Sequence, residues 1–179
     1  TLFPYTTLFR SMAGTPEQIK KYVPDLLAGK TIGMMSLSES GSGSDAAGAM
    51  KTFARRDGDV YRISGEKMWA SIANETDVGI LFAKTDRDAG ANGVTAFIVE
   101  PKKYPGFTTQ PIDMLGMSKS WRTNILFLDE FVVPVENRLG EEGDGFKIIM
   151  RALQPGRVSV AAKAVAKSCA KSCRTTRCA

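Results

Sequence analysis

Residues 50–69, MKTFARRDGDVYRISGEKMW, decide the fold of this chain. Apolar and polar side chains alternate from Met50 to Arg56 and again from Val60 to Trp69, which is the period of a half-buried β-strand. The two segments flank Asp57-Gly58-Asp59, a sequence typical of a tight turn. The stretch therefore predicts a β-hairpin.

Further strands are predicted on both sides of this hairpin, because short apolar runs are separated there by Gly, Pro, Asn and Asp. We expect them at residues 32–37, 78–84, 94–100, 107–112 and 125–133. Seven or so strands without an intervening helix predict a mainly β fold, a mostly antiparallel β-barrel or sandwich.

Helical patterns lie at both ends of the β region. Thr15 can cap a helix and Pro16 suits its first position, and apolar residues follow at helical spacing. A second helical pattern follows Gly145, in which Pro155-Gly156 should kink or break the helix. The predicted order is a short helix, a β-domain and the beginning of another helix.

The net charge of +5 comes from one end of the chain. The sequence has 24 Lys and Arg against 19 Asp and Glu, and five basic residues without an acidic one lie between Lys163 and Ala179. This tail contains no aromatic residue for bases to stack on, so we expect no nucleic-acid binding. No apolar run reaches the ~20 residues of a membrane span and no signal peptide is apparent, so we expect an intracellular protein that does not enter a membrane.

Histidine is absent, which excludes imidazole general bases, Ser-His-Asp triads and His-ligated zinc within this chain. Cys169, Cys173 and Cys178 do not have the spacing of zinc ligands, so we expect no metal site. Cys169 and Cys173 lie in a small low-complexity repeat, residues 166–173, and residues 1–11, TLFPYTTLFRS, show no clear periodicity. We expect both ends of the chain to be non-native.

Residues 38–45, SESGSGSD, are rich in hydroxyl groups and in backbone amides without bulky side chains. The string from Gly41 to Ala46 matches a dinucleotide-binding fingerprint, but a strand follows it where that fingerprint requires a helix. One interpretation is a loop of hydrogen-bond donors for a phosphate or a flavin edge. The alternative is a plain surface loop.

Two other places could carry chemistry. In residues 67–71, KMWAS, Trp69 is either a core residue or an aromatic wall for a planar cofactor, with the Ser71 hydroxyl beside it. Arg157, in the last helical pattern, is either a solvated charge or a ligand for a phosphate or carboxylate.

Several motifs occur together in a fixed order. They are SESGSGSD at 38–45, GEKMWASIAN at 65–74, LDEFVVPVENRLG at 128–140, EEGDGFKIIMRAL at 141–153 and LQPGR at 153–157. With these motifs, residues 15–165 resemble the middle of an acyl-CoA dehydrogenase.

The resemblance implies a division of the chain. Residues 12–30 would end an N-terminal helical domain, and residues 31–140 would form the central β-domain with the FAD and acyl-CoA site. Residues 141–165 would begin a C-terminal helical domain. Residues 1–11 would be a non-native leader, and residues 166–179 are a basic, cysteine-containing tail without the family pattern.

The resemblance also implies which residues bind ligands. FAD would contact Met35, Ser36, Leu37, Ser38, Glu39, Ser40, Gly41, Ser42, Gly43, Ser44, Trp69, Ala70 and Ser71. The acyl-CoA would contact Ser44, Gln154 and Arg157, where Gln154 stands in place of the usual Asp.

The implied reaction is α,β-dehydrogenation of an acyl-CoA thioester, with hydride transfer to flavin N5 and reoxidation by an electron-transfer flavoprotein. The family's catalytic carboxylate belongs to the C-terminal domain, so we expect no catalytic residue in this chain and a fragment that is inactive alone. Its parent would be a homo-oligomer of the bacterial cytoplasm or the mitochondrial matrix. Alternatives are an acyl-CoA oxidase or flavin monooxygenase on the same fold, or a non-catalytic flavin- or CoA-binding module.

Overall fold

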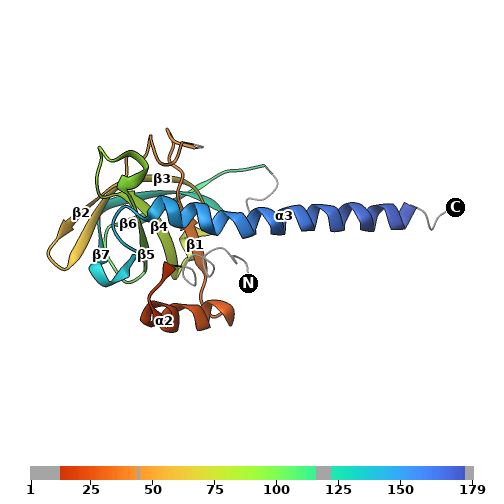
Figure 1. The fold of residues 1–179 in the computed structure, drawn as a ribbon, viewed down its shortest axis with the longest axis horizontal. Helices are drawn as coiled ribbons and strands as arrows, with labels where there is room; N and C mark the ends of the chain where they lie inside the picture. The colour runs from red at the N-terminus through yellow and green to blue at the C-terminus, as the bar shows by residue number, and fades with distance from the viewer. Residues whose placement is uncertain (1–12, 44, 116–121, 176–179) are drawn as a thin grey trace.

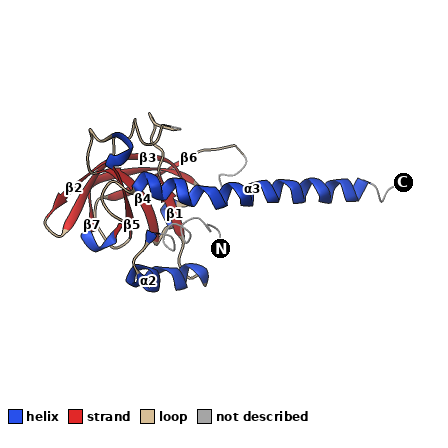
Figure 2. Ribbon diagram, viewed as in Figure 1, coloured by secondary structure: helices blue, strands red, loops and turns tan. Residues whose placement is uncertain are grey.

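The computed structural model describes residues 13–43, 45–115 and 122–175 (Figure 1). The expected leader, residues 1–11, and the last four residues of the tail lie outside this part of the chain. The described part contains two α-helices, α2 (Pro16–Leu27) and α3 (Gly145–Thr175), which come before and after an eight-stranded sheet in the chain (Figure 2). The strands are β1 (Gly33–Ser36), β2 (Phe53–Asp57), β3 (Val60–Ser71), β4 (Val78–Lys84), β5 (Val94–Val99), β6 (Phe107–Ile112), β7 (Thr123–Pro134) and β8 (Arg138–Leu139).

The sheet is mixed but mostly antiparallel. Its strands follow the order β6-β7-β3-β2-β4-β5-β8, and β1 pairs with β4 beside this path. The β1–β4 and β2–β4 pairs are parallel, and the other pairs are antiparallel. The predicted mainly β fold is confirmed. The sheet of the described strands is not closed into a barrel, because its path ends at β6 and β8, and the barrel or sandwich form therefore stays a prediction.

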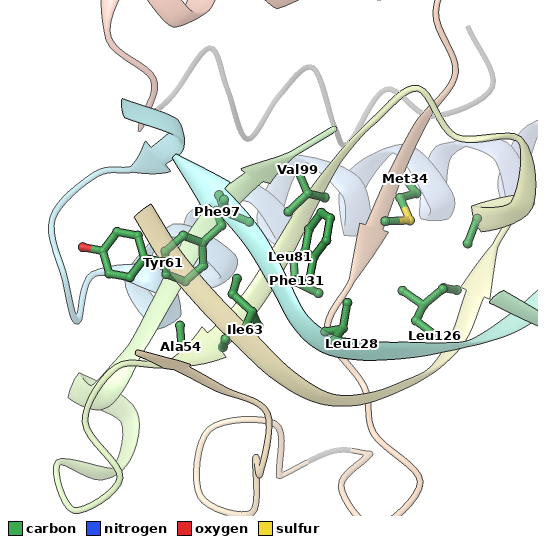
Figure 3. Packing of buried hydrophobic residues seen from close by; sticks show 14 residues of the cluster. Met34, Ala54, Tyr61, Ile63, Leu81, Phe97, Val99, Leu126, Leu128 and Phe131 are labelled. Atoms are coloured by element: carbon green, nitrogen blue, oxygen red, sulfur yellow. The ribbon is translucent and has the colours of Figure 1, made fainter. Parts of the chain in front are cut away.

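The middle of the sheet is buried on both faces, since every residue of β4 and β5 is buried. One face of these strands packs under the helices, with Tyr22 and Leu26 of α2 and Ile148 and Ile149 of α3 in one cluster. The other face packs against β3 and β7, where the rings of Tyr61 and Phe97 meet edge to face at 4.9 Å (Figure 3). The sheet therefore folds over a second buried hydrophobic cluster, against which the inner side of β3 packs.

Helix α2 forms where the sequence predicts it. Thr15 and Gln18 make a capping box, in which each side chain bonds the other's backbone amide, at 3.2 and 3.0 Å. The Gln18 amide group also donates to the carbonyls of Glu136 and Arg138 at 2.8 and 2.9 Å. These bonds attach the beginning of α2 to the segment between β7 and β8.

Helix α3 differs from the prediction, because it continues through Pro155-Gly156 as one helix of 31 residues (Figure 1). Proline removes one backbone donor and leaves the carbonyl four residues earlier without its partner. This carbonyl belongs to Arg151, which is exposed, so water can bond it. The predicted break is therefore wrong.

Candidate functional site

The loop between β1 and β2 and the end of β3 are bonded to each other, although about 30 residues separate them. The backbone amide of Met68 donates to the carbonyl of Ser38 at 2.8 Å. The Lys67 ammonium group donates to the carbonyl of Leu37 at 3.1 Å. The structure therefore brings together the hydroxyl-rich loop and the Trp69 segment, the two places singled out in the sequence.

Glu39 is the centre of this junction. Its buried carboxylate accepts from the Thr52 hydroxyl at 2.6 Å, from the Thr52 amide at 3.0 Å and from the Lys51 amide at 2.7 Å. It also pairs with the Lys67 ammonium at 2.9 Å. One carboxylate thus connects the loop, the segment before β2 and strand β3.

The protonation of this buried pair reflects its surroundings. Burial lowers the pKa of Lys67 to about 8, although the charge of Glu39 acts in the opposite direction. Burial also opposes the charged form of Glu39, but the Lys67 charge and the bonds from Thr52 and Lys51 hold its pKa below the usual range. Both groups are therefore charged at neutral pH.

The tip of the loop is open on its outer side. The backbones of Glu39 and Ser42 bond each other twice at 3.1 Å, and the Ser42 hydroxyl donates to the carbonyl of Asp45 at 2.7 Å. A Cβ added to Gly41 or Gly43 would meet no atom of the described chain within 4 Å. Amides and hydroxyls beside open space suit the phosphates and polar ring edge of a flavin nucleotide.

Trp69 faces outward, which makes its interpretation as a core residue wrong. Its side chain is 54% exposed and its backbone has a φ of 66°. The pairing of β3 with β7 is irregular between Lys67 and Ala70, and this break in alternation turns the ring away from the core. The indole is therefore a free aromatic surface beside the loop.

The residues that follow Trp69 at the end of β3 are held by contacts with β7. Ala70 is buried, Ser71 is half-buried, and Ile72 has a φ of 58°. The side-chain amide of Asn124, on β7, donates to the carbonyl of Ala70 and to the side-chain oxygen of Asn74, both at 3.3 Å. These contacts support the backbone on which Trp69 and Ser71 stand.

The remaining predicted FAD contacts are placed as follows. Met35 packs against the helix-covered cluster, Ser36 is buried with an unpaired hydroxyl, and Ser40 is exposed. Ser44 lies outside the described residues.

The predicted acyl-CoA contacts are not joined to this junction. Gln154 and Arg157 are exposed on α3, and within the described chain no hydrogen bond or ion pair links them to the loop. Arg157 lines a mainly apolar hollow of about 380 Å³ with Leu153, Gly156, Val160 and Ala161.

Two features escaped the sequence interpretation. Lys67 was not identified as the partner of Glu39, although it shares the period-two face of Tyr61 and Ile63, which marks it for burial. A polar hollow of about 560 Å³ was also missed, because its lining residues come from segments that are far apart in the sequence. It is lined by Phe53, Thr85, Asp86, Arg87, Asn92, Glu142 and Gly143.

The described residues contain no group of three or more His, Cys, Asp or Glu side chains arranged to hold a metal ion. No helix in this part of the chain is both long enough and apolar enough to cross a membrane.

Residues 34–130 match the family model described as acyl-CoA dehydrogenase, middle domain. The chain belongs to the acyl-CoA dehydrogenase family, and the resemblance found in the sequence is confirmed. It is 39% identical to a short-chain specific acyl-CoA dehydrogenase of Clostridium acetobutylicum, over 92% of this chain and 44% of that protein. It is 42% identical to the mitochondrial short-chain enzyme of Bos taurus, over 85% of this chain and 36% of that protein.

Solved structures agree with these relatives. A glutaryl-coenzyme A dehydrogenase in complex with glutaryl-CoA superposes with a TM-score of 0.83 at 39% identity, covering 88% of this chain and 40% of that one. Butyryl-CoA dehydrogenase from Megasphaera elsdenii superposes with a TM-score of 0.82 at 38% identity, covering 88% and 41%. The chain thus spans less than half the length of the relatives it matches.

Proposed function

We propose that this chain carries the flavin- and substrate-binding β-domain of an FAD-dependent acyl-CoA dehydrogenase. The observation that carries the proposal is the junction of the 37–45 loop with the outward-facing Trp69. One solved relative, 40% identical with a TM-score of 0.76, has a title that names an acyl-CoA dehydrogenase complexed with FAD. The reaction would be α,β-dehydrogenation of an acyl-CoA thioester.

The residues of the junction fit a flavin nucleotide. Loop amides and the hydroxyls of Ser38 and Ser40 would bind the phosphates and polar edge, and Trp69 would cover one side of the ring system. Ser71, at the end of β3, would present its hydroxyl near N5. Bound FAD would supply the hydride acceptor for the β-hydrogen of the substrate.

The substrate and partners belong to the same proposal. Ser44, Gln154 and Arg157 would contact acyl-CoA, the base that removes the α-proton would come from outside this chain, and residues 31–140 would form the β-domain. A neighbour with a TM-score of 0.83 carries a title on an electron transferring flavoprotein, which supports such a protein as electron acceptor. The enzyme would be a homo-oligomer in the bacterial cytoplasm or the mitochondrial matrix.

An oxidase on the same fold is the second candidate. One neighbour, with a TM-score of 0.79 at 34% identity, is titled as the prolyl acyl carrier protein oxidase AnaB. An oxidase would pass electrons from the reduced flavin to oxygen, whereas a dehydrogenase would need a protein acceptor or a dye.

Absorbance and activity of the full-length gene product test the proposal. We expect a yellow protein with a flavin spectrum that is bleached by an acyl-CoA and that reduces a dye. Oxygen consumption without the dye would favour the oxidase, and a colourless, inert protein would overturn both.

Trp69→Ala tests the site itself. Aromatic stacking contributes roughly 0.5–1.5 kcal/mol, so we expect the dissociation constant for FAD to rise up to about tenfold. Leu27→Ala is the control, since it also removes a large exposed apolar side chain, but from α2. Equal affinities in the two variants would place the flavin elsewhere.

A further inference from the structure

The Glu39–Lys67 ion pair connects the loop to β3. We propose that both are positioning residues for the cofactor, and that the charged pair holds residues 37–43 of the loop in the form that binds FAD. The proposal rests on the proposed function, because it takes the loop as the flavin site.

The bonds around the pair show why the loop depends on it. Glu39 lies in the loop shortly after β1 ends at Ser36, and its carboxylate binds four donor groups, which belong to Lys51, Thr52 and Lys67. Lys67 adds a bond to the carbonyl of Leu37, and Met68 adds one to Ser38. Three consecutive loop residues, 37–39, are thus fixed to the strand that ends in Trp69.

Lys67 has one charged neighbour among the groups packed around it in the described chain. Leu126 stands opposite it on β7, and the carbonyl of Leu37 faces it from the end of β1. Glu66 precedes it on the other face of β3, and the side chain of Lys51 is exposed. Lys84, on β4, bonds instead to the carbonyls of Gly48 and Arg87. Glu39 is therefore the counter-charge that stabilises the ammonium form of Lys67.

Protonation of Lys67 should then control cofactor affinity. Its pKa of about 8 means that the ammonium becomes neutral as the pH rises through that value. The Glu39 carboxylate then loses its counter-charge in a buried place, and the ion pair that helps to attach the loop to β3 is lost, while the bond from the Met68 amide to the Ser38 carbonyl remains. We expect FAD affinity to be full below about pH 8 and to fall above it, the logarithm of the dissociation constant rising by up to about one per pH unit.

Protein stability should change in the opposite direction. An unfolded lysine has a pKa near ~10.4, so between about pH 8 and about pH 10 the unfolded chain binds more protons than the folded one. The contribution of Lys67 to the free energy of unfolding therefore rises with pH in this interval. A residue that only stabilised the fold would not weaken FAD binding where it increases stability.

The test titrates FAD into the apo form of the full-length gene product between about pH 7 and about pH 9.5, with urea unfolding at each pH. Lys67→Met should weaken FAD binding about tenfold at pH 7 and remove both pH dependences. Glu39→Gln keeps an acceptor but removes the counter-charge, so affinity should begin to fall at a lower pH than in the unmodified protein. Lys102→Met is the control, because it removes a lysine from an exposed ion pair with Asp77 of 2.7 Å. It should keep the original profile.

A flat FAD profile in the unmodified protein, or an unchanged one in Lys67→Met, would overturn the inference while leaving the proposed function standing. Loss of FAD binding to the unmodified protein at every pH would instead refute the proposed function. If the Lys67 and Glu39 variants fail to fold, the unmodified protein still decides. Opposite trends of affinity and stability above about pH 8 support the inference, and parallel trends contradict it.

Discussion

Gly65 is a single residue on which the geometry of the junction depends. It has a φ of 147°, and a Cβ there would lie 2.7 Å from the Cα of Thr52. Thr52 is the residue whose amide and hydroxyl bind Glu39, at 3.0 and 2.6 Å. Glycine therefore allows the chain before β2 to approach β3 closely enough to reach the carboxylate.

Gly65→Ala should lower the free energy of unfolding by about 2 kcal/mol or more, because strain and a backbone clash add. Gly58→Ala is the matched control. Gly58 also has a positive φ, 60°, but open space around it, so its substitution should cost about 1 kcal/mol. Urea unfolding of both variants measures the difference, and equal losses would contradict the close approach.

At this scale the sequence predicts the residue types better than their partners. The hydroxyls and glycines of residues 38–45 and the aromatic ring of Trp69 could be singled out by their chemistry. The outward direction of Trp69 could not, since it depends on an irregularity in the pairing of β3 with β7. The Glu39–Lys67 pair also depends on a contact between segments about 30 residues apart.

Among the elements, α3 offers a direct test of the corrected break at Pro155. Pro155→Ala should raise the stability of the helix by up to about 3 kcal/mol, because it restores a backbone donor and removes a steric clash. Since the helix already passes through this position, its helical content should not change.

Circular dichroism during thermal unfolding measures both quantities. Val158→Ala, at an exposed position in the same helix, is the control and should change stability by about 0.5 kcal/mol at most. A marked gain of helical signal in Pro155→Ala would mean that proline does interrupt the helix.

Local sequence determined most elements. The Asp57-Gly58-Asp59 turn, the helix cap at Thr15 and the bounds of β4 and β6 agree with the structure. The parallel pairing of β1 with β4 could not be predicted, because it depends on how the sheet folds over its core. Pro155 misled the interpretation because a proline inside a helix lowers its stability without necessarily ending it, and here the helix continues to Thr175.

For the molecule as a whole, carboxylates that connect separate segments predict loss of stability in acid. Burial opposes the charged forms of Asp77 and Glu100, but their bonds hold both pKa values below the usual range. Asp77 accepts from Lys102 and from the amide of Ile32, and Glu100 accepts from Tyr22 of α2. Their stabilisation is present above the pKa values of the unfolded chain and disappears as the pH falls through the folded values.

We expect the melting temperature to fall steadily between about pH 5 and about pH 3. Glu100→Gln should reduce this slope, since one of the groups no longer titrates. Glu136→Gln is a control for the removal of one carboxylate near the same end of α2. An unchanged slope in Glu100→Gln would show that titration of Glu100 does not contribute to the loss of stability in acid.

The pairing of β3 with β7 has a consequence for how the chain folds. Ser71 pairs with Thr123 and Val60 with Pro134, so β4, β5 and β6 all lie in the chain between the two strands. The β2–β3 hairpin closes across one turn, whereas β3–β7 closes a long loop, whose entropy slows its formation. Local hairpins should therefore form first in refolding, and the strand end that carries Trp69 should become ordered in the last and slowest phase.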